Sequence, residues 1–187
     1  MDTNTTLFRV DVSQTTKDRQ YWATRPWASD ETAHHIRTAD LLLLPWEDFR
    51  EKRPTLFPQG TTDFMRMLIK RLPESAVAVA VDKEWYQEIA LHARKTRWPT
   101  IMVTAVMLPL LVDVLSDCTK KLIDEHASDQ TIEFRVIVEG QHRQCIEVEY
   151  KGAANDLART LAEQADRCLA ELERKPSHSP EESRQKR

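Results

Sequence analysis

The stretch TIEFRVIVEGQHRQCIEVEYK, residues 131–151, decides the fold class. Apolar and polar residues alternate on both sides of Gly140, from Thr131 to Glu139 and from Arg143 to Lys151. Alternation with a period of two is typical of strands that bury one face, and a glycine between two such runs predicts a β-hairpin. We therefore expect a hairpin with one apolar face and one charged face.

The apolar face of this hairpin needs a cover. The expected register pairs its apolar residues across the two strands: Phe134 with Val148, Ile132 with Tyr150, and Val136 with Ile146. Asn155 or Asp156 can cap a helix that runs to about Arg174. Apolar residues recur in that helix at the spacing of one buried stripe, and the helix is expected to cover the hairpin: Leu157, Leu161, Ala165, Leu169 and Leu172.

Upstream of the hairpin, short apolar runs alternate with helical patterns. Strands are expected at residues 7–12, 41–44, 76–81 and 101–104, and helices at 30–39, 61–72, 84–94 and from about 105 to 125. The polar stretch 13–30 is expected to be a loop. Strands that alternate with helices imply crossover connections and parallel pairing. We predict an α/β fold with a mostly parallel three-strand core and flanking helices, plus a C-terminal β-hairpin and covering helix.

The expected domain organisation is simple. Residues 1–174 are predicted to form a single α/β domain, in which 131–174 make a hairpin–helix subdomain. From Arg174 to Arg187 the chain has five Lys or Arg and two Asp or Glu, a charge of +3. Residues 175–187 contain two Pro and no large apolar residue, so we expect a disordered basic tail.

Composition excludes several function classes. The chain has three Gly, far apart in sequence, whereas a P-loop and a dinucleotide fingerprint need them close together. A net charge of −3 gives no reason to expect nucleic acid binding. Three widely spaced Cys and an N-terminus without a signal-peptide pattern favour a cytoplasmic protein. The apolar run 98–115 is interrupted by Pro109 and Asp113, so no membrane span is expected.

A metal-dependent enzyme is one hypothesis. Glu149-Tyr150-Lys151 has the ExK form, and Asp129 precedes the neighbouring strand, an arrangement that resembles the PD-(D/E)xK nucleases. The resemblance implies that Asp129, Glu133 and Glu149 hold Mg²⁺ and that Lys151 positions the attacking water.

The expected register has consequences for this charged face. It places Glu133 opposite Glu149, a pair of like charges that a metal ion would neutralise. It also places Arg135 opposite Glu147, which favours the alternative of a solvated face with mixed charge pairs and no metal.

A second candidate site lies where the expected strands end. Ligands of open α/β sheets bind beyond the carboxyl ends of strands, and a helix N-terminus can hold a phosphate. The residues at these positions include Trp46, Glu47, Asp48, Asp82, Glu84 and the helix start Gly60-Thr61-Thr62. The alternative is ordinary helix capping.

An aromatic segment points instead to a protein partner. Arg, Tyr and Trp are the residue types that anchor protein interfaces, and they crowd one short stretch: Arg19, Tyr21, Trp22, Arg25 and Trp27. The alternative is that Trp22 and Trp27 fold back onto their own sheet as a lid.

The C-terminal part carries one further resemblance. The run 98–116, WPTIMVTAVMLPLLVDVLS, followed by the hairpin and by Tyr150-Lys151-Gly152-Ala153, resembles small bacterial proteins of the kind that accompany conflict and antiphage systems. It covers roughly the last 80 residues and implies an accessory role without catalytic residues.

The predicted function is therefore a non-enzymatic accessory module without a cofactor. Its aromatic segment would dock a partner protein of a bacterial defence or conflict system. The alternative is an Mg²⁺-dependent nuclease.

Overall fold

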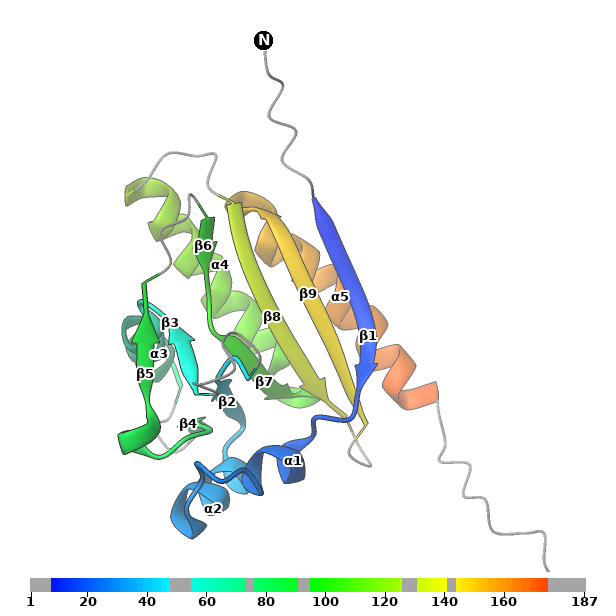
Figure 1. Cartoon of the computed structure of the whole chain (residues 1–187). Coiled ribbons are helices and arrows are strands. Elements are labelled where there is room, and N and C mark those ends of the chain that lie inside the picture. Colours follow the sequence, from blue (N-terminus) through cyan, green and yellow to red (C-terminus); the bar gives the residue numbers. More distant parts are fainter. Residues whose placement is uncertain are drawn as a thin grey trace, which may run out of the picture.

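The computed structural model describes residues 8–47, 55–72, 76–90, 95–125, 131–140 and 144–174. Within these ranges the chain forms a seven-stranded sheet in the order β1-β9-β8-β7-β2-β4, with β6 paired to β8 (Figure 1). Its strands are β1 (Arg9–Thr15), β2 (Leu41–Leu44), β4 (Val77–Val79), β6 (Lys95–Arg97), β7 (Thr100–Thr104), β8 (Thr131–Glu139) and β9 (Cys145–Ala153). The predicted α/β class is confirmed.

The sheet is mixed, so the prediction of a mostly parallel three-strand core is wrong. β2 pairs with β4 in parallel but with β7 antiparallel, and β7 pairs with β8 in parallel. The hairpin of β8 and β9 continues this sheet, and β1 pairs antiparallel with β9. The described residues between β4 and β7 form η2 (Lys83–Trp85), β5 (Gln87–Ile89) and β6, and they include no crossover helix that would return the chain to the same end of the sheet.

The segment after β4 is where the secondary-structure prediction fails. A helix was expected at 84–94, but the described residues 83–90 form the 3-10 turn η2 (Lys83–Trp85) and β5 (Gln87–Ile89), and residues 91–94 lie outside the described ranges. β5 pairs in parallel with β3 (Leu56–Pro58), which lies in a stretch with no predicted element. The Tyr86 ring stacks on Phe57 at 4.7 Å, a tertiary contact that overrides the local helical preference.

Five α-helices lie within the described residues, and four of them precede β8 in the chain. Ser29, not Asp30, caps α2 (Asp30–Thr38), and Gly60 starts α3 (Thr61–Ile69) with a φ of 89°. The expected loop 13–30 in fact contains the end of β1 and the short helix α1 (Arg19–Ala23). The turn η3 (Ala105–Met107) leads into α4 (Leu108–Glu125). None of the described helices is both long and apolar enough to cross a membrane.

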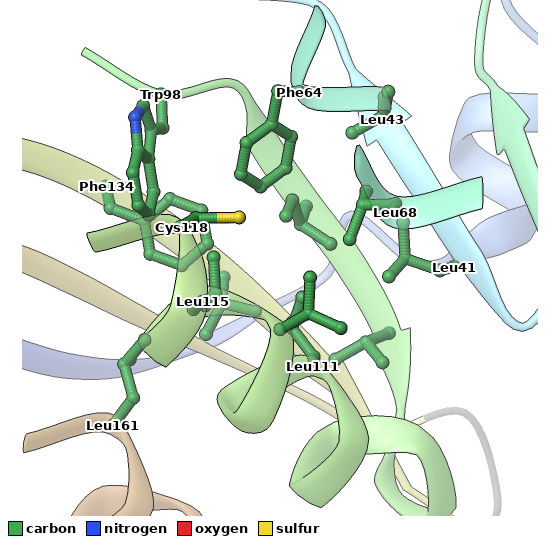
Figure 2. Packing of buried hydrophobic residues seen from close by; sticks show 14 of the residues in the cluster. Leu41, Leu43, Phe64, Leu68, Trp98, Leu111, Leu115, Cys118, Phe134 and Leu161 are labelled. Carbon is green, nitrogen blue, oxygen red and sulfur yellow. The ribbon is translucent and has the colours of Figure 1, made fainter. Parts of the chain in front are cut away.

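The main core lies between the sheet and two long helices. α4 and α5 (Ala154–Arg174) cover the same face of the sheet, as Figure 1 shows, and the expected covering helix is confirmed. Figure 2 shows Leu111, Leu115 and Cys118 of α4 packed among side chains of the sheet and of α3. The strand at 41–44 is buried throughout, as predicted. The tail 175–187 lies outside the described residues.

The opposite face of the sheet is covered only in part. Leu42, Met102 and Ile137 lie on this face and pack with Trp22 of α1 and Ile36 of α2 in a second apolar cluster. Further along β8 and β9 this face carries charged side chains. The candidate functional site lies at the boundary between the two regions.

Candidate functional site

A cleft of about 360 Å³ lies on this second face of the sheet. We call it the charged cleft. It is lined by Lys17, Trp22, Pro45, Trp46, Glu47, Arg97, Trp98, Thr100, Glu133, Phe134, Arg135, Ile137, Glu147 and Glu149. Outward-facing residues of β8 and β9 supply its charged floor, and the residues that follow β2 supply one wall.

Glu133 sits between two cations on this floor. The Arg97 Nε donates to one carboxylate oxygen at 2.6 Å, and the Lys151 ammonium lies 3.4 Å from the other. Burial alone would raise the pKa of Glu133, but the charges and hydrogen bonds of Arg97 and Lys151 outweigh it and hold the pKa below its ordinary value. Glu133 is therefore an ionised acceptor at neutral pH and not a proton donor.

Arg135 has the opposite arrangement. Its guanidinium lies between two carboxylates, with Nε 3.0 Å from Glu147 and Nη2 3.2 Å from Glu149. The Arg135 and Glu149 side chains are 44% and 51% exposed, so both remain open to a ligand. The floor thus has a group of two cations and one carboxylate, net +1, beside a group of two carboxylates and one cation, net −1.

The wall of the cleft combines an aromatic ring with further charges. Trp46 is half-buried, and the Arg97 guanidinium lies 5.9 Å from its ring centroid. Beside it, Glu47 accepts hydrogen bonds of 2.6 Å from Lys17 Nζ and from the Tyr21 hydroxyl. Arg25 stacks on the Tyr21 ring at 3.5 Å. These contacts fix the wall in place.

The structure removes the like-charge pair on which part of the nuclease hypothesis rested. The register of the hairpin is shifted by two residues from the predicted one, so Glu133 pairs with Lys151 and Arg135 with Glu149. The predicted like-charge pair of Glu133 and Glu149 is therefore wrong. Asp129 lies outside the described residues. Within the part of the chain that the structure describes, no group of three or more His, Cys, Asp or Glu is placed to hold a metal ion.

The aromatic segment is mostly structural. Trp22 and Trp27 are 3% and 6% exposed, so they do not present the open docking surface that the sequence suggested. The physical reason is that each indole packs into an apolar cluster of its own fold, Trp22 near α2 and Trp27 in the main core. The lid alternative is the better description. Tyr21 and Arg25 do not line the charged cleft, but both contact Glu47 in its wall, and the Arg25 side chain is 30% exposed.

Arg19 is also held inside the fold. Its side chain is 11% exposed and pairs with Glu139, which is 12% exposed. It also donates to the carbonyls of Ile36, at 2.8 Å, and of Ala39 at the end of α2. Arg19 thus joins α1, the C-terminus of α2 and the end of β8.

The second predicted site is divided in the structure: Trp46 and Glu47 line the charged cleft, Asp48 lies outside the described residues, and the expected helix starts are capped by side chains. The Glu88 carboxylate accepts from the backbone N–H of Gly60 at 2.9 Å and of Thr62 at 2.8 Å, so it fills the anion position at the N-terminus of α3. The Asp82 carboxylate lies at the N-terminus of α2, where it accepts hydrogen bonds from the backbone N–H and the hydroxyl of the N-cap residue Ser29. The predicted phosphate position is therefore occupied by a side chain of the protein.

This cap makes stability depend on pH. Burial alone would raise the pKa of Glu88, but hydrogen bonds from Thr62, Tyr86 and Gly60 lower it below its ordinary value of 4.5. A carboxyl whose pKa is lower in the folded state stabilises the fold above its unfolded pKa and loses that effect as pH falls through its folded pKa. We expect Glu88→Gln to cost about 1 kcal/mol at neutral pH, and the difference from wild type to vanish in acid.

Urea unfolding at a series of pH values would measure this effect. Glu84→Gln is a matched control, because Glu84 is an exposed neighbour in η2. A Glu88→Gln cost that stayed constant from neutral pH to acid would contradict the assignment of Glu88 as an ionised cap.

Sequence reasoning missed Arg97 as a site residue. It belongs to the three-residue strand β6, which has no apolar pattern and reaches the cleft only by pairing with β8. Trp46 was found by its place at the end of a buried strand, and that position is the signal for the wall of the cleft.

Comparison with known proteins gives no further constraint. No family model matches the sequence, and neither a curated protein nor a solved structure is significantly similar to it.

Proposed function

We propose that the chain is a non-enzymatic interaction module whose charged cleft binds an extended segment of a partner protein. The observation that carries this proposal is the pair of neighbouring charge groups on the cleft floor, one with two cations around Glu133 and one with two carboxylates around Arg135. Interfaces that match such a pattern gain specificity from complementary charge.

The spacing of the two groups defines the chemistry of the partner. Glu133 and Arg135 are two residues apart on β8 and face the same side. Residues at this separation in a strand lie about 7 Å apart. An extended partner segment therefore fits if it has an acidic side chain facing Arg97 and Lys151 and a basic one two positions away, facing Glu147 and Glu149.

The wall supplies the expected energetic anchor. Trp and Arg are the residue types most often found at interface hot spots, and Trp46 with Arg97 brings both to the rim of the cleft. The resemblance of the C-terminal part to proteins of bacterial conflict and antiphage systems makes components of such systems the first partners to test.

Differential capture tests this proposal. The tagged wild-type chain and its Trp46→Ala and Arg135→Glu variants would each be purified from the native host, and the bound proteins quantified by mass spectrometry. We expect one partner whose affinity falls about 30-fold or more in the Trp46→Ala variant, the loss typical of a hot spot. Binding of synthetic partner segments would then locate the acidic and basic side chains.

Trp85→Ala is the matched control, because Trp85 is 45% exposed and does not line the cleft. If every protein captured by wild type is retained equally by the Trp46→Ala and Arg135→Glu variants, the cleft is not the binding site. Cleavage of DNA or RNA that needs Mg²⁺ or Mn²⁺ and is lost in Glu149→Ala would instead support the nuclease alternative.

A further inference from the structure

The strand β1 (Arg9–Thr15) forms one edge of the large sheet. Among the described strands it pairs only with β9, and five of its seven residues are exposed (Figure 1). The other edge strand, β4, has three residues. An exposed strand of this length offers unpaired backbone N–H and C=O groups to another strand. Its sequence, RVDVSQT, contains no proline that would prevent such pairing.

One face of this edge is unusually apolar. Phe8 and Val12 are 57% and 44% exposed, and they stand on the same side as Val10, which packs against the main core. The Phe8 ring meets Tyr150 edge-on at a centroid distance of 5.8 Å, and Val12 lies opposite Val148. The apolar stripe of the core therefore continues to the outer rim of the sheet.

The other face of β1 is charged. Arg9 and Asp11 stand two residues apart and form an ion pair along the strand, with side chains 72% and 48% exposed. Such an exposed pair within one strand adds little to stability. Both groups are free to exchange partners with a second strand.

In one antiparallel register, each face of β1 is complementary to the same face of β1 in a second copy of the chain. If Val10 lies opposite the Val10 of a second copy, Phe8 meets the other Val12 and Arg9 meets the other Asp11, each contact occurring twice. A register centred on Asp11 would oppose two carboxylates, and one centred on Arg9 would oppose two guanidinium groups. A register centred on Val12 places Val10 opposite Gln14.

We propose that two copies of this chain associate through β1, with Val10 on the two-fold axis, into one continuous sheet. The interface is isologous, as is usual for dimers of identical chains. The C-terminal turns of α5 reach past this edge in Figure 1, so the second copy would lie beside them as well. The β1 edge does not line the charged cleft, and the dimer is independent of the function proposed above.

Charge exchange gives a direct test with the full-length chain. Sedimentation equilibrium at a range of concentrations should give the mass of two 21.8 kDa chains at high concentration. In the Arg9→Asp variant two carboxylates would face each other at each contact, and in the Asp11→Arg variant two guanidinium groups would do so. Each variant alone should therefore dimerise about tenfold more weakly than wild type. An equal mixture of the two variants restores both attractive pairs in a heterodimer, and we expect it to recover the wild-type association constant.

Arg66→Asp, on the exposed side of α3, is the control for a change of charge alone. A wild-type chain that stays monomeric at all concentrations overturns the proposal, as does a dimer that none of the β1 variants weakens. If a variant fails to fold, amide exchange in wild-type β1 decides the question, because only a β1 interface slows exchange there as concentration rises. Partner capture by the charged cleft is measured separately, so failure of one proposal leaves the other standing.

Discussion

Replacing Arg19 by methionine should lower the free energy of unfolding by about 3–5 kcal/mol, the usual cost of breaking a buried ion pair. The side chain pairs with Glu139 and donates to the carbonyl groups that end α2. Without it, a carboxylate that is 12% exposed would lose its cation, and the carbonyls of Ile36 and Ala39 would lose a donor. Urea unfolding followed by circular dichroism would measure the loss.

Two controls separate this effect from a general change of charge. Arg159→Met removes an arginine that is 72% exposed and pairs with Asp156 one turn away on α5, so its cost should stay within about 0.5 kcal/mol. The double change Arg19→Met with Glu139→Leu should recover much of the loss, because it leaves no unpaired carboxylate.

The Arg19 result also decides between two roles. Sequence alone placed Arg19 among residues that dock a partner, because arginine beside tryptophan is typical of an interface. A loss below about 1 kcal/mol, combined with loss of a captured partner, would favour the docking role over the structural one. A large loss of stability supports the structural role that the buried ion pair indicates.

The hairpin shows which parts of the fold the sequence could predict. Alternation with a period of two identifies both strands and both faces correctly, and a shift of two residues changes neither face. Hydrophobic pattern therefore cannot distinguish the predicted register from the observed one. The charges could have done so, because the observed register pairs Glu133 with Lys151 and Arg135 with Glu149, whereas the predicted one opposes two glutamates.

Gly152 shows a second feature that the hydrophobic pattern does not predict, the close packing at the end of β9. A Cβ atom at this position would lie 2.7 Å from the Tyr150 hydroxyl oxygen and 3.1 Å from a ring carbon of Phe8. The Tyr150 ring thus occupies the space that a side chain at Gly152 would need, while its hydroxyl donates to the carbonyl of Ala153 at 2.6 Å. This local packing joins β9 to the residue before β1, and it has no signature in the pattern of either strand alone.

The cleft was less predictable than the strands, for a topological reason. The sequence marks Glu133, Glu149 and Lys151 as neighbours because they share one hairpin. Arg97 joins them only because β6 pairs with β8. Trp46 follows β2, and it lies close to the same floor because a single strand, β7, stands between β2 and β8 in the sheet. The order of strands therefore builds the site, and the sequence pattern predicted no strand order.

Trp98→Ala should be about as costly as the loss of Arg19, at about 3–5 kcal/mol, because it removes a large buried ring. Trp98 is 9% exposed and lies between Phe64 of α3, at a centroid distance of 5.3 Å, and Phe134 of β8, at 5.8 Å (Figure 2). The same change at Trp85, which is 45% exposed, should cost no more than about 0.5 kcal/mol. Chemical denaturation of the two variants makes the comparison.

Trp98 also lines the charged cleft, so its ring joins the core to the proposed binding surface. A ligand that binds only the folded chain stabilises it in proportion to its concentration and affinity. Trp98→Phe should keep most of the core contacts with Phe64 and Phe134. Its cost in free energy of unfolding should therefore be smaller than that of Trp98→Ala, at about 1–2 kcal/mol. If Trp98→Ala cost less than about 1 kcal/mol, the ring would not be part of the core, and the floor of the cleft would have to be more adaptable than its packing indicates.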